Sequence, residues 1–504
     1  MLAAITTASL LGTSGHRVTV EVHVGPGLPG FSIVGLPDEI CRESRDRVRA
    51  ALLSSGLVWP NKRITVNLAP SGVRKSGTGL DLALAVGVLV AADAIPPAAV
   101  ERFAFIGEVG LDGSVRPVPG MAPMAAAIGD DSEIVVAPAN VLEARVVSAL
   151  AVRPVGRLDV LVAVLKGECP WPDEEPAAAV AEPPSPPDLT DVRGQPFARL
   201  ALEVAAAGQH HLFLVGPPGA GKTMLAARLP GLLPPLTPAR ALEATMVHSA
   251  AGVPLPAGGL LRTPPFRAPH HTVSIVAMVG GGTASLRPGE LSLAHTGVLF
   301  LDELGEFSPA VLDGLRQPLE EREVRVSRAR ASVTMPADVL LVGATNPCPC
   351  GGGRPGQCEC TEAARARYLR RLSGPLLDRF DLRVGVERPG VDELLAMDGG
   401  EPSAIVRDRV AVARRRAAAR GVLANGLLPA SVLDDVAPLT APARQLLRTE
   451  LERGRLSGRG LHRVRRVART LADLDGDHEV IDDGAIATAL QLRVDVAART
   501  RAAA

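Results

Sequence analysis

The chain has 504 residues, enough for about three domains at roughly 150 residues each. It carries 54 Lys and Arg against 54 Asp and Glu, so its net charge gives no sign of a polyanionic partner, and any nucleic-acid site must be a local patch. Aromatic residues make up only 2% of the chain, which argues against recognition by base stacking, and six cysteines are too few for a disulfide scaffold.

The N-terminal segment is apolar but lacks the basic n-region of a signal peptide. Residues 17–24 alternate as in a β-strand, so we expect a first strand there. The longest apolar run, residues 82–92, is too short to span a bilayer. These patterns predict a soluble, cytoplasmic protein without a membrane partner.

Residues 1–172 mix short β patterns, at 63–68 and 133–137, with helical stretches at 38–53 and 79–92. This mixture predicts an α+β domain.

Two segments of this domain resemble Lon-type proteases. Residues 76–85 resemble the segment that carries their serine, and residues 107–120 resemble the segment before their catalytic lysine. In this alignment the lysine position falls at Ala122 or at a neighbouring Met or Pro, and a Ser–Lys dyad needs a lysine to accept the serine proton. We therefore expect a Lon-protease-like fold that is inactive as a protease.

The chain has no lysine between Lys75 and Lys166. An active protease would therefore need one of these two lysines to reach Ser76 or Thr78.

Residues 173–187 are acidic and rich in proline. Such a segment cannot bury enough apolar surface to fold, and its prolines favour an extended spacer. We therefore place an interdomain linker at residues 173–190 and a second domain at residues 191–390.

The second domain contains an apolar run at 212–215, a glycine-rich loop at 216–223 and a helical run at 224–229. Strand, loop and helix in this order form a phosphate-binding loop, because glycines let backbone N–H groups converge on phosphate oxygens and the helix turns its positive N-terminus to the same anion. Lys222 is expected near the terminal phosphates of ATP, and Thr223 is expected to offer its hydroxyl to Mg²⁺. The nucleotide-binding candidates are Gly216, Pro217, Pro218, Gly219, Ala220, Gly221, Lys222 and Thr223. The alternative is a glycine turn that happens to precede a lysine.

Residues 298–303 form an apolar run that ends in two acids. One carboxylate at a strand tip beside the glycine loop can hold the magnesium shell of the nucleotide, and another can polarise the attacking water. We assign the first role to Asp302 and the second to Glu303. The alternative is a strand capped by a solvated acidic turn.

Several further motifs point to one family. They are PFRAPHHT at 265–272, MVGGG at 278–282, PGELSLAH at 288–295, NPCPCG at 346–351 and GLPGFSIVGLP at 27–37. With the phosphate loop, they resemble the Mg-chelatase-like AAA+ ATPases of the YifB/ComM family over nearly the whole chain. The resemblance implies ATP hydrolysis by a hexameric ring and, for the ComM branch, DNA branch migration during uptake of transforming DNA. Mg-chelatase proper shares the ATPase but lacks the Lon-like front domain, so the order of domains favours ComM.

The resemblance also assigns roles to two polar residues. Asn346 ends an apolar run at 339–346 and resembles the first sensor of AAA+ ATPases, which helps orient the water; a turn-forming Asn is the alternative. Arg379 resembles the arginine finger, which acts on the γ-phosphate in the neighbouring subunit and is worth about 10³–10⁵ in rate in comparable NTPases. A plain surface arginine is the alternative there.

Two inserts lie between these motifs. Residues 264–297 carry His270 and His271, and their family position resembles the helix-2 insert that faces the pore of the ring. Residues 323–334 alternate like a hairpin, and their arginines could hold a phosphate backbone without reading sequence. These arginines are Arg325, Arg328 and Arg330. The alternative is a hairpin that faces solvent or another subunit.

Four cysteines form two close pairs in a glycine-rich segment. They are Cys348, Cys350, Cys358 and Cys360. Four thiolates can close a tetrahedral structural Zn²⁺ site, although a Cys-x-Cys spacing is tighter than the common two-residue gap. Reduced thiols without a metal are the alternative.

Residues 391–504 are rich in Arg and Ala, with helices expected at 405–420, 441–454, 460–474 and 482–500. This pattern fits an AAA+ lid. Residues 457–461 resemble the second-sensor motif of related helicase ATPases, and Arg459 at the helix start could contact the γ-phosphate, with Arg466 as the second choice. The alternative is a solvated helix face.

The sequence therefore predicts a multidomain α/β protein with a Lon-protease-like α+β domain, an AAA+ P-loop α/β domain and a helical C-terminal lid. We expect a homo-oligomeric ring motor that uses ATP and Mg²⁺ and acts on single-stranded or branched DNA without sequence preference. The alternative is a Mg-chelatase-like subunit that remodels a protein partner or drives metal insertion. Stimulation of ATP hydrolysis by DNA would separate the two.

Overall fold

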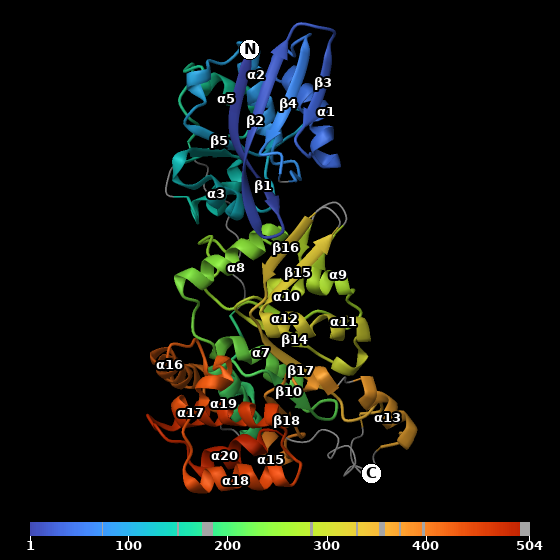
Figure 1. The fold of residues 1–504 in the computed structure, drawn as a ribbon, viewed down its shortest axis with the longest axis vertical. Coiled ribbons are helices and arrows are strands. Elements are labelled where there is room, and N and C mark those ends of the chain that lie inside the picture. The colour runs from blue at the N-terminus through green and yellow to red at the C-terminus, as the bar shows by residue number, and fades with distance from the viewer. Residues whose placement is uncertain are drawn as a thin grey trace.

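The fold is described from a computed structural model of the full chain. The N-terminal domain lies at one end of the molecule, the parallel sheet of the second domain in the middle and the C-terminal helices at the other end (Figure 1). The structure describes residues 1–72, 74–148, 151–173, 185–282, 286–328, 331–351, 358–371, 374–395 and 399–493. Within these ranges, every helix is too short or too polar to cross a membrane.

The N-terminal domain is built on a seven-stranded sheet in the order β3-β4-β2-β1-β5-β8-β9. Its strands are β1 (Leu2–Leu11), β2 (Ser14–Gly25), β3 (Gly30–Val34), β4 (Arg63–Ala69), β5 (Phe103–Ile106), β8 (Glu133–Val136) and β9 (Val152–Pro154). A small antiparallel pair, β6 (Glu108–Val109) with β7 (Val115–Arg116), lies beside it. β1 and β2 form an antiparallel hairpin, so the strand expected at residues 17–24 lies within β2 and a further strand precedes it.

The helices of this domain are α1 (Glu39–Ser54), α2 (Asp81–Ala91), α3 (Met121–Ile128), α4 (Val141–Arg145) and α5 (Leu158–Leu165). Every residue of α2 is buried, which accounts for its uninterrupted apolar run, because a helix that is apolar all round must pack on more than one side. The one acid of α2, Asp81, is paired with Arg47 of α1 at 2.8 Å.

Lys75 and Ser76, two of the residues considered for a protease dyad, have other partners. Lys75 is fully buried and its ammonium donates to the carbonyl oxygen of Pro70. The hydroxyl of Ser76 donates to the carbonyl oxygen of Leu10 at 2.9 Å. Lys166 is exposed at the end of α5. The expected lack of protease activity stays a prediction.

The second domain, which is the expected ATPase domain and is called so below, is built on a five-stranded parallel sheet in the order β11-β14-β17-β10-β18. Its strands are β10 (Leu212–Val215), β11 (Phe266–Arg267), β14 (Val298–Leu301), β17 (Leu340–Thr345) and β18 (Leu382–Gly385). All residues of β10, β14 and β17 are buried, as expected for central strands of a parallel sheet with both faces covered. The three apolar runs that predict strands in this domain are thereby confirmed.

The helices of this domain are α6 (Pro196–Gly208), α7 (Lys222–Leu232), α8 (Pro238–Ala251), α9 (Ile275–Val279), α10 (Glu290–Leu293), α11 (Pro309–Gly314), α12 (Arg316–Glu321), α13 (Glu362–Arg371) and α14 (Gly374–Leu377). Antiparallel pairs are formed by β12 (Gly280–Gly281) with β13 (Arg287–Pro288) and by β15 (Glu323–Arg328) with β16 (Ala331–Pro336). The hairpin expected at residues 323–334 is thus confirmed. One of its faces packs on the ATPase core, because Val324, Val326, Val333 and Met335 are buried there.

The C-terminal helices are α15 (Val391–Leu395), α16 (Ser403–Ala419), α17 (Leu433–Val436), α18 (Ala441–Glu452), α19 (Gly458–Asp475) and α20 (Asp483–Gln491). Of these, α16, α17, α18, α19 and α20 share one apolar core with α6 and α7. The helix expected to run to residue 500 ends at Gln491, which corrects that prediction. Arg493 then forms a bridge with Arg383 of β18 and donates to the carbonyl oxygen of Phe380 at 2.9 Å. Residues 494–504 lie outside the described residues.

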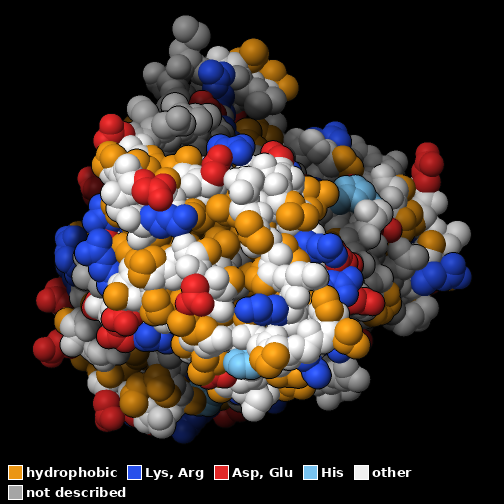
Figure 2. Space-filling view, turned by 90° about the horizontal axis from the view of Figure 1, so that it is seen from above, with side chains coloured by type: hydrophobic (Ala, Val, Ile, Leu, Met, Phe, Trp, Pro, Cys, Tyr) orange, Lys and Arg blue, Asp and Glu red, His pale blue; other side chains and the backbone are white. Residues whose placement is uncertain are grey.

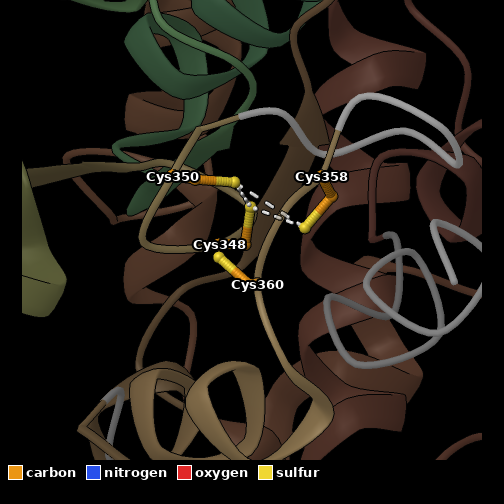
Figure 3. A group of neighbouring side chains, drawn as sticks. All are labelled: Cys348, Cys350, Cys358 and Cys360. Atoms are coloured by element: carbon orange, nitrogen blue, oxygen red, sulfur yellow. Dashed lines mark hydrogen bonds between the residues drawn. The ribbon is translucent and has the colours of Figure 1, made fainter.

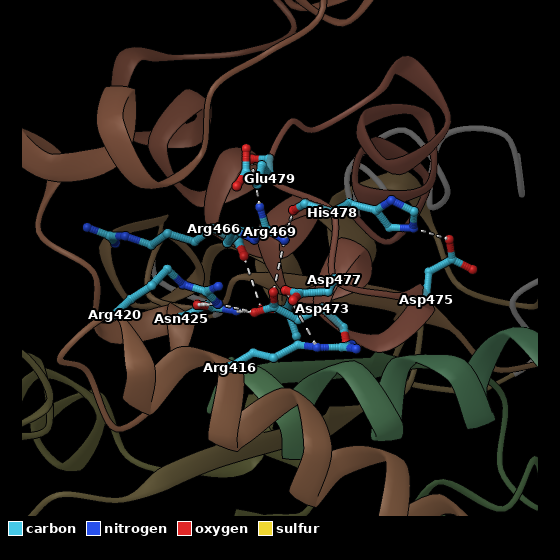
Figure 4. A network of polar contacts seen from close by, with 11 residues as sticks. Arg416, Arg420, Asn425, Arg466, Arg469, Asp473, Asp475, Asp477, His478 and Glu479 are labelled. Atoms are coloured by element: carbon cyan, nitrogen blue, oxygen red, sulfur yellow. Dashed lines mark hydrogen bonds and ion pairs between the residues drawn. The ribbon is translucent and has the colours of Figure 1, made fainter.

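A buried ionic network joins α19 to the end of α16 (Figure 4). Asp473 of α19 is fully buried and accepts hydrogen bonds from Arg469 at 2.9 Å, from Asn425 at 2.6 Å and from Arg420. Arg420 caps α16 and Asn425 follows it in the chain, so one carboxylate ties two C-terminal helices together. Removing one partner of such a pair leaves an uncompensated buried charge, which typically costs about 3–5 kcal/mol.

The N-terminal domain is docked on α8 and on the β15–β16 hairpin (Figure 1). The N–H of Ala122 lies 3.2 Å from the Ser249 hydroxyl of α8 and 3.2 Å from the Glu143 carboxylate, and the Ser249 hydroxyl also donates to Glu143. The turn between β1 and β2 meets the hairpin so closely that a Cβ at Gly12 would lie 2.2 Å from Val333. The residue at the expected position of a Lon-type lysine, Ala122, is therefore part of the contact between domains.

The end of the molecule formed by the N-terminal domain carries side chains of mixed character. Basic and acidic side chains are interspersed among hydrophobic ones on this face (Figure 2).

The packed structure of the ATPase domain begins inside the segment expected to be a linker. Leu189 is only 1% exposed, lies in the core shared with α6 and α7, and donates its N–H to the hydroxyl of Ser403 at 2.7 Å. Residues 174–184, the middle of the expected linker, lie outside the described residues.

Candidate nucleotide site and cysteine cluster

The glycine-rich loop at 216–223 connects β10 to α7 at the carboxyl edge of the parallel sheet, where α/β proteins bind their ligands. Gly219 and Gly221 have φ angles of +75° and +87°, which residues with a side chain rarely adopt. A Cβ at Gly216 would lie 2.1 Å from the carbonyl oxygen of Val386, so the chain passes too closely there for any other residue. α7 begins at Lys222, so the positive N-terminus of this helix adjoins the loop.

Lys222 connects the loop to the candidate first sensor. Its ammonium donates to the carbonyl oxygens of Gly216 at 2.7 Å and Pro217 at 3.0 Å, and to Oδ1 of Asn346 at 3.0 Å. Burial lowers the pKa of Lys222, and the carboxylates of Asp302 and Glu303 oppose this shift. The structure therefore brings Lys222 and Asn346, which are 124 positions apart in sequence, to one point.

The two candidate magnesium ligands are also in contact. The hydroxyl of Thr223 donates to Oδ2 of Asp302 at 2.7 Å, since Asp302 directly follows β14 at the same edge of the sheet. Hydroxyl and carboxylate oxygens are hard ligands that suit Mg²⁺, so this donor set fits a nucleotide-bound magnesium. Glu303 follows with its side chain 56% exposed and one carboxylate oxygen 3.5 Å from Nδ1 of His271.

Two further residues contact the loop and carry no motif that would identify them. Arg388, in the segment after β18, donates through Nε and Nη2 to the carbonyl oxygen of Pro218 at 3.1 and 3.0 Å. Gln195, just before α6, donates to the carbonyl oxygen of Ala220 at 2.8 Å. A recess beside Gln195 is lined by Leu189, Val192, Gly194, Pro196, Leu200 and Val406, with polar residues at its side. The contacts of Arg388 and Gln195 with the loop arise only from tertiary folding, so no spacing of residues along the sequence predicts them.

Arg379 lies at the opposite edge of the sheet from the phosphate loop. It lines a cavity together with His211, which directly precedes β10. The backbone carbonyl oxygen of His211 accepts a hydrogen bond from the N–H of Leu382 at the start of β18. The phosphate loop follows the other end of β10, and a four-residue strand spans roughly 13 Å. The Arg379 guanidinium is paired with Glu320 at 2.6 Å, and its side chain is 13% exposed. The structure therefore does not bring Arg379 to the phosphate loop of its own chain.

The second-sensor candidates lie on the Arg379 side as well. Arg466 lines the same cavity as Arg379, and its side chain extends away from the Asp473 network (Figure 4). Arg463, also in this cavity, donates to Oδ1 of Asp381 at 2.5 Å and to the carbonyl oxygen of Arg379 at 2.8 Å. Arg459 is exposed in the first turn of α19, four residues before Arg463 and hence on the same helix face.

Asp381 anchors this arrangement at the start of β18. Burial alone would raise its pKa, but the hydrogen bond with His210 and the charge of Arg463 outweigh burial and hold the pKa of Asp381 well below its usual range. The carboxylate is thus ionised at neutral pH, and its contact with Arg463 fixes α19 to the start of β18.

The hairpin arginines are described only in part. Arg325 is exposed and paired with Glu323 at 2.5 Å and with Glu321 at 3.5 Å, so its charge is compensated locally. The side chain of Arg328 and the whole of Arg330 lie outside the described residues.

The four cysteines converge beside the phosphate loop (Figure 3). All their sulfur atoms lie within 4.8 Å of one another. Cys348 and Cys350 are 3.4 Å apart, and Cys358 lies 3.6 and 3.7 Å from them. A tetrahedral Zn²⁺ with bonds of about 2.3 Å holds its sulfurs about 3.8 Å apart, so the donor set fits this metal. The cluster adjoins the nucleotide site, because a Cβ at Gly351 would lie 2.6 Å from the ring of Pro218.

Comparison with known proteins assigns the chain to a family. Family models match in three places: "Magnesium chelatase, subunit ChlI" at residues 188–394, "Subunit ChlI of Mg-chelatase" at 20–140 and "Magnesium chelatase, subunit ChlI C-terminal" at 400–493. An uncharacterised protein of Mycobacterium tuberculosis is 46% identical over 476 residues, which cover 93% of this chain and 94% of that protein. YifB of Escherichia coli is 41% identical over 477 residues, 94% of each chain. Competence protein ComM of Haemophilus influenzae is 41% identical over 485 residues, 95% of each chain.

The chain belongs to the Mg-chelatase-like YifB/ComM family. As a YifB/ComM protein it is an AAA+ ATPase of mixed α/β architecture, built around the parallel sheet that carries the phosphate loop. The family match that begins at residue 188 agrees with the packing of Leu189 in the ATPase core.

Proposed function

We propose that this chain is an ATP-hydrolysing motor that assembles as a hexameric ring and acts on DNA. The observation that carries the proposal is the division of the expected catalytic groups between two edges of one sheet. Lys222 and Glu303 lie at the carboxyl edge, whereas Arg379 lies at the amino edge. A single subunit therefore has an incomplete site, and a neighbour in a head-to-tail ring supplies the missing arginine.

Each residue at the carboxyl edge has a distinct task in this proposal. Bound ATP with Mg²⁺ supplies the phosphoanhydride bond to be cleaved and neutralises part of the phosphate charge. Lys222 and the loop N–H groups hold the phosphates, and Thr223 and Asp302 hold the metal ion. Glu303 polarises the attacking water, and Asn346 orients the same water from the end of β17. The apolar recess beside Gln195 accommodates the base.

The amino edge completes the site of the next subunit. Arg379 neutralises charge on the neighbour's γ-phosphate, for which it must leave Glu320. Arg459 and Arg466 lie on the same side as Arg379, so we propose that a second sensor from this lid also acts on the neighbour's nucleotide.

DNA is proposed as the substrate because the relative from Haemophilus influenzae is named a competence protein and shares 41% identity over 95% of the chain. We propose single-stranded or branched DNA, held by its phosphates without sequence preference, and branch migration as the work performed. The matches to a magnesium chelatase subunit favour a second candidate, an ATPase that remodels a protein partner or drives metal insertion.

The experiment that separates these candidates is an ATP hydrolysis assay with and without DNA. We expect single-stranded or four-way branched DNA to raise the turnover of the wild-type protein, with Glu303→Gln protein as the matched inactive control. A turnover that neither DNA changes would contradict a DNA motor and favour the chelatase-like candidate.

We further propose that the cysteine cluster holds a structural Zn²⁺ and that the N-terminal domain is a Lon-like fold without protease activity. The sulfur positions support the first proposal. The lack of protease activity is supported by the side chains of Lys75 and Ser76, which donate to backbone carbonyl oxygens. It is also supported by Ala122, whose N–H contacts Ser249 of α8.

A further inference from the structure

The single tyrosine of the chain lies beside the candidate first sensor. Tyr368 belongs to α13 and is only 5% exposed. Its hydroxyl forms a hydrogen bond of 2.7 Å with the hydroxyl of Thr345, the last residue of β17. Thr345 directly precedes Asn346, so the phenol is tied to the residue next to the expected sensor.

The phenol also contacts Asn346 itself. Burial raises the pKa of Tyr368, and hydrogen bonds with the Thr345 hydroxyl and with the backbone of Asn346 oppose this shift. The phenol is therefore neutral at physiological pH, with an O–H to donate and an oxygen to accept. These two contacts hold the backbone from which the Asn346 side chain extends to Lys222, at 3.0 Å.

The ring of Tyr368 packs against the segment that follows β14. A Cβ at Gly305 would lie 2.9 Å from Cε2 of the ring, so a side chain there would displace the ring. Gly305 is the second residue after Glu303, and the next residue, Glu306, donates its N–H to the carbonyl oxygen of Glu303 at 2.7 Å. One side chain of α13 therefore contacts the segments that carry both residues expected to act on the attacking water, Glu303 and Asn346.

The cysteine cluster joins the two ends of the connection between Asn346 and α13. Cys348 is the second residue after Asn346, and Cys360 is the second residue before Glu362, where α13 begins. The sulfur atoms of these two cysteines lie within 4.8 Å of each other. α13 is thus held to the end of β17 twice, by the cluster and by the hydroxyl of Tyr368.

We infer that Tyr368 is a positioning residue that holds Asn346 in place for hydrolysis, and that the metal-loaded cysteine cluster keeps α13 where Tyr368 reaches β17. Tyr368 acts through Thr345 and Asn346, and the cluster acts through α13. The rate of hydrolysis therefore depends on metal in the cluster, although that metal takes no part in the reaction. The inference rests on the proposed function for the sensor role of Asn346 and on the proposed metal in the cluster.

The first test is steady-state ATP hydrolysis by full-length Tyr368→Phe protein, which keeps the ring beside Gly305 and removes only the hydroxyl. A displacement of about 1 Å at a catalytic group can cost about 10²-fold in rate. One of two ties is lost here, so we expect kcat to fall by about tenfold and the KM for ATP to stay within about twofold of wild type. Thr345→Val removes the partner hydroxyl and should also lower kcat, and the double variant should be no slower than Tyr368→Phe alone.

A second background separates positioning from general loss of structure. In Asn346→Ala protein, Tyr368→Phe should change kcat no further, because the residue through which it acts has lost its amide. Thr245→Val is the matched control: Thr245 is a fully buried hydroxyl of α8 that accepts the N–H of Leu261 at 3.0 Å, so its loss should change stability but leave kcat within about twofold.

Two kinetic results would overturn the inference. One is a Tyr368→Phe protein that is folded by thermal melting and has the wild-type kcat. The other is a tenfold fall that persists in the Asn346→Ala background.

The role of the cluster is tested on the tyrosine itself. Because the chain has one tyrosine, incorporated fluorotyrosine gives a single fluorine NMR signal, from α13. We expect removal of the metal by a chelator selective for zinc over magnesium to move this signal toward that of free fluorotyrosine, and added Zn²⁺ to restore it. The kcat should fall by about tenfold with the metal removed, whereas Tyr368→Phe protein should lose no more than about twofold. The same signal from metal-free and zinc-loaded protein would overturn the role of the cluster.

Failure of the proposed function gives a different result. If Asn346→Ala protein keeps its turnover, the sensor assignment is wrong whatever Tyr368→Phe does. If Asn346→Ala protein is slow but Tyr368→Phe protein is not, the sensor assignment stands and the positioning role of Tyr368 is wrong.

Discussion

The assignment of Arg379 as an arginine finger predicts that its loss affects catalysis far more than stability. Within its own subunit, Arg379 pairs with Glu320, whose side chain is 59% exposed. Such an ion pair contributes at most about 1 kcal/mol, because solvent screens it. Loss of a finger lowers turnover by about 10³–10⁵, equivalent to roughly 4–7 kcal/mol in the activation barrier. Arg379→Ala should therefore melt near the wild-type temperature, bind ATP and hydrolyse almost none of it.

The assay pairs ATP turnover with equilibrium binding of a fluorescent ATP analogue at the same subunit concentration. Glu320→Gln is the matched control: it breaks the same ion pair but leaves the guanidinium available to a neighbour, so we expect turnover within about twofold of the wild type. The reasoning is refuted if Arg379→Ala hydrolyses ATP at the wild-type rate, or if Glu320→Gln loses as much turnover as Arg379→Ala.

Three further predictions concern the nucleotide, the metal and pH. Lys222→Ala should weaken ATP binding because its ammonium no longer meets the phosphates, whereas Glu303→Gln should bind ATP normally without turning it over; normal turnover by Glu303→Gln is incompatible with its assigned role. Purified protein should carry about one zinc per chain by mass spectrometry, and Cys348→Ser should lose it; metal-free protein with unchanged stability and hydrolysis would show that the thiols are not a structural site. Asp381 has a folded-state pKa below its ordinary value of 3.8, so it stabilises the fold above that pH and loses this contribution as the pH falls through the folded-state pKa. In urea unfolding, the free energy of unfolding that Asp381→Asn loses relative to wild type should be largest at neutral pH and should become smaller below pH 3.8. A loss of the same size at neutral pH and below pH 3.8 contradicts this.

The carboxyl edge of the site could be predicted because its parts are local. The loop at 216–223 stands between a strand and a helix in sequence, and the acids at 302–303 directly follow an apolar strand. Parallel strands end at one edge of a sheet, so residues that follow them meet there, as Thr223 and Asp302 do at 2.7 Å.

The parts that depend on long-range packing could not be predicted from local patterns. Arg388 and Gln195 contact backbone carbonyl oxygens of the loop. Every residue has such an oxygen, so the residue types of the loop do not indicate which side chain contacts it. The side on which Arg466 lies is set by how α19 packs on α6 and α16, which the helical pattern does not specify.

Helix ends show the same limit. The helix expected from residue 482 onward ends at Gln491. Arg493 instead donates to carbonyl oxygens of Phe380 and Asp381 beside β18, at 2.9 and 3.0 Å. These tertiary bonds hold Arg493 outside α20.

The central claim, that each ATP site is shared between two subunits, is tested most directly by mixing two inactive variants. Arg379→Ala subunits keep an intact phosphate loop, and Lys222→Ala subunits keep an intact finger. In rings formed from equal amounts, about one interface in four pairs an intact loop with an intact finger, because each head-to-tail contact joins two independently drawn subunits. With mixed rings verified by native mass spectrometry, the account predicts turnover well above that of either parent, up to about a quarter of the wild-type rate if interfaces act independently. Turnover no greater than the sum of the two parents in those mixed rings would contradict a shared site.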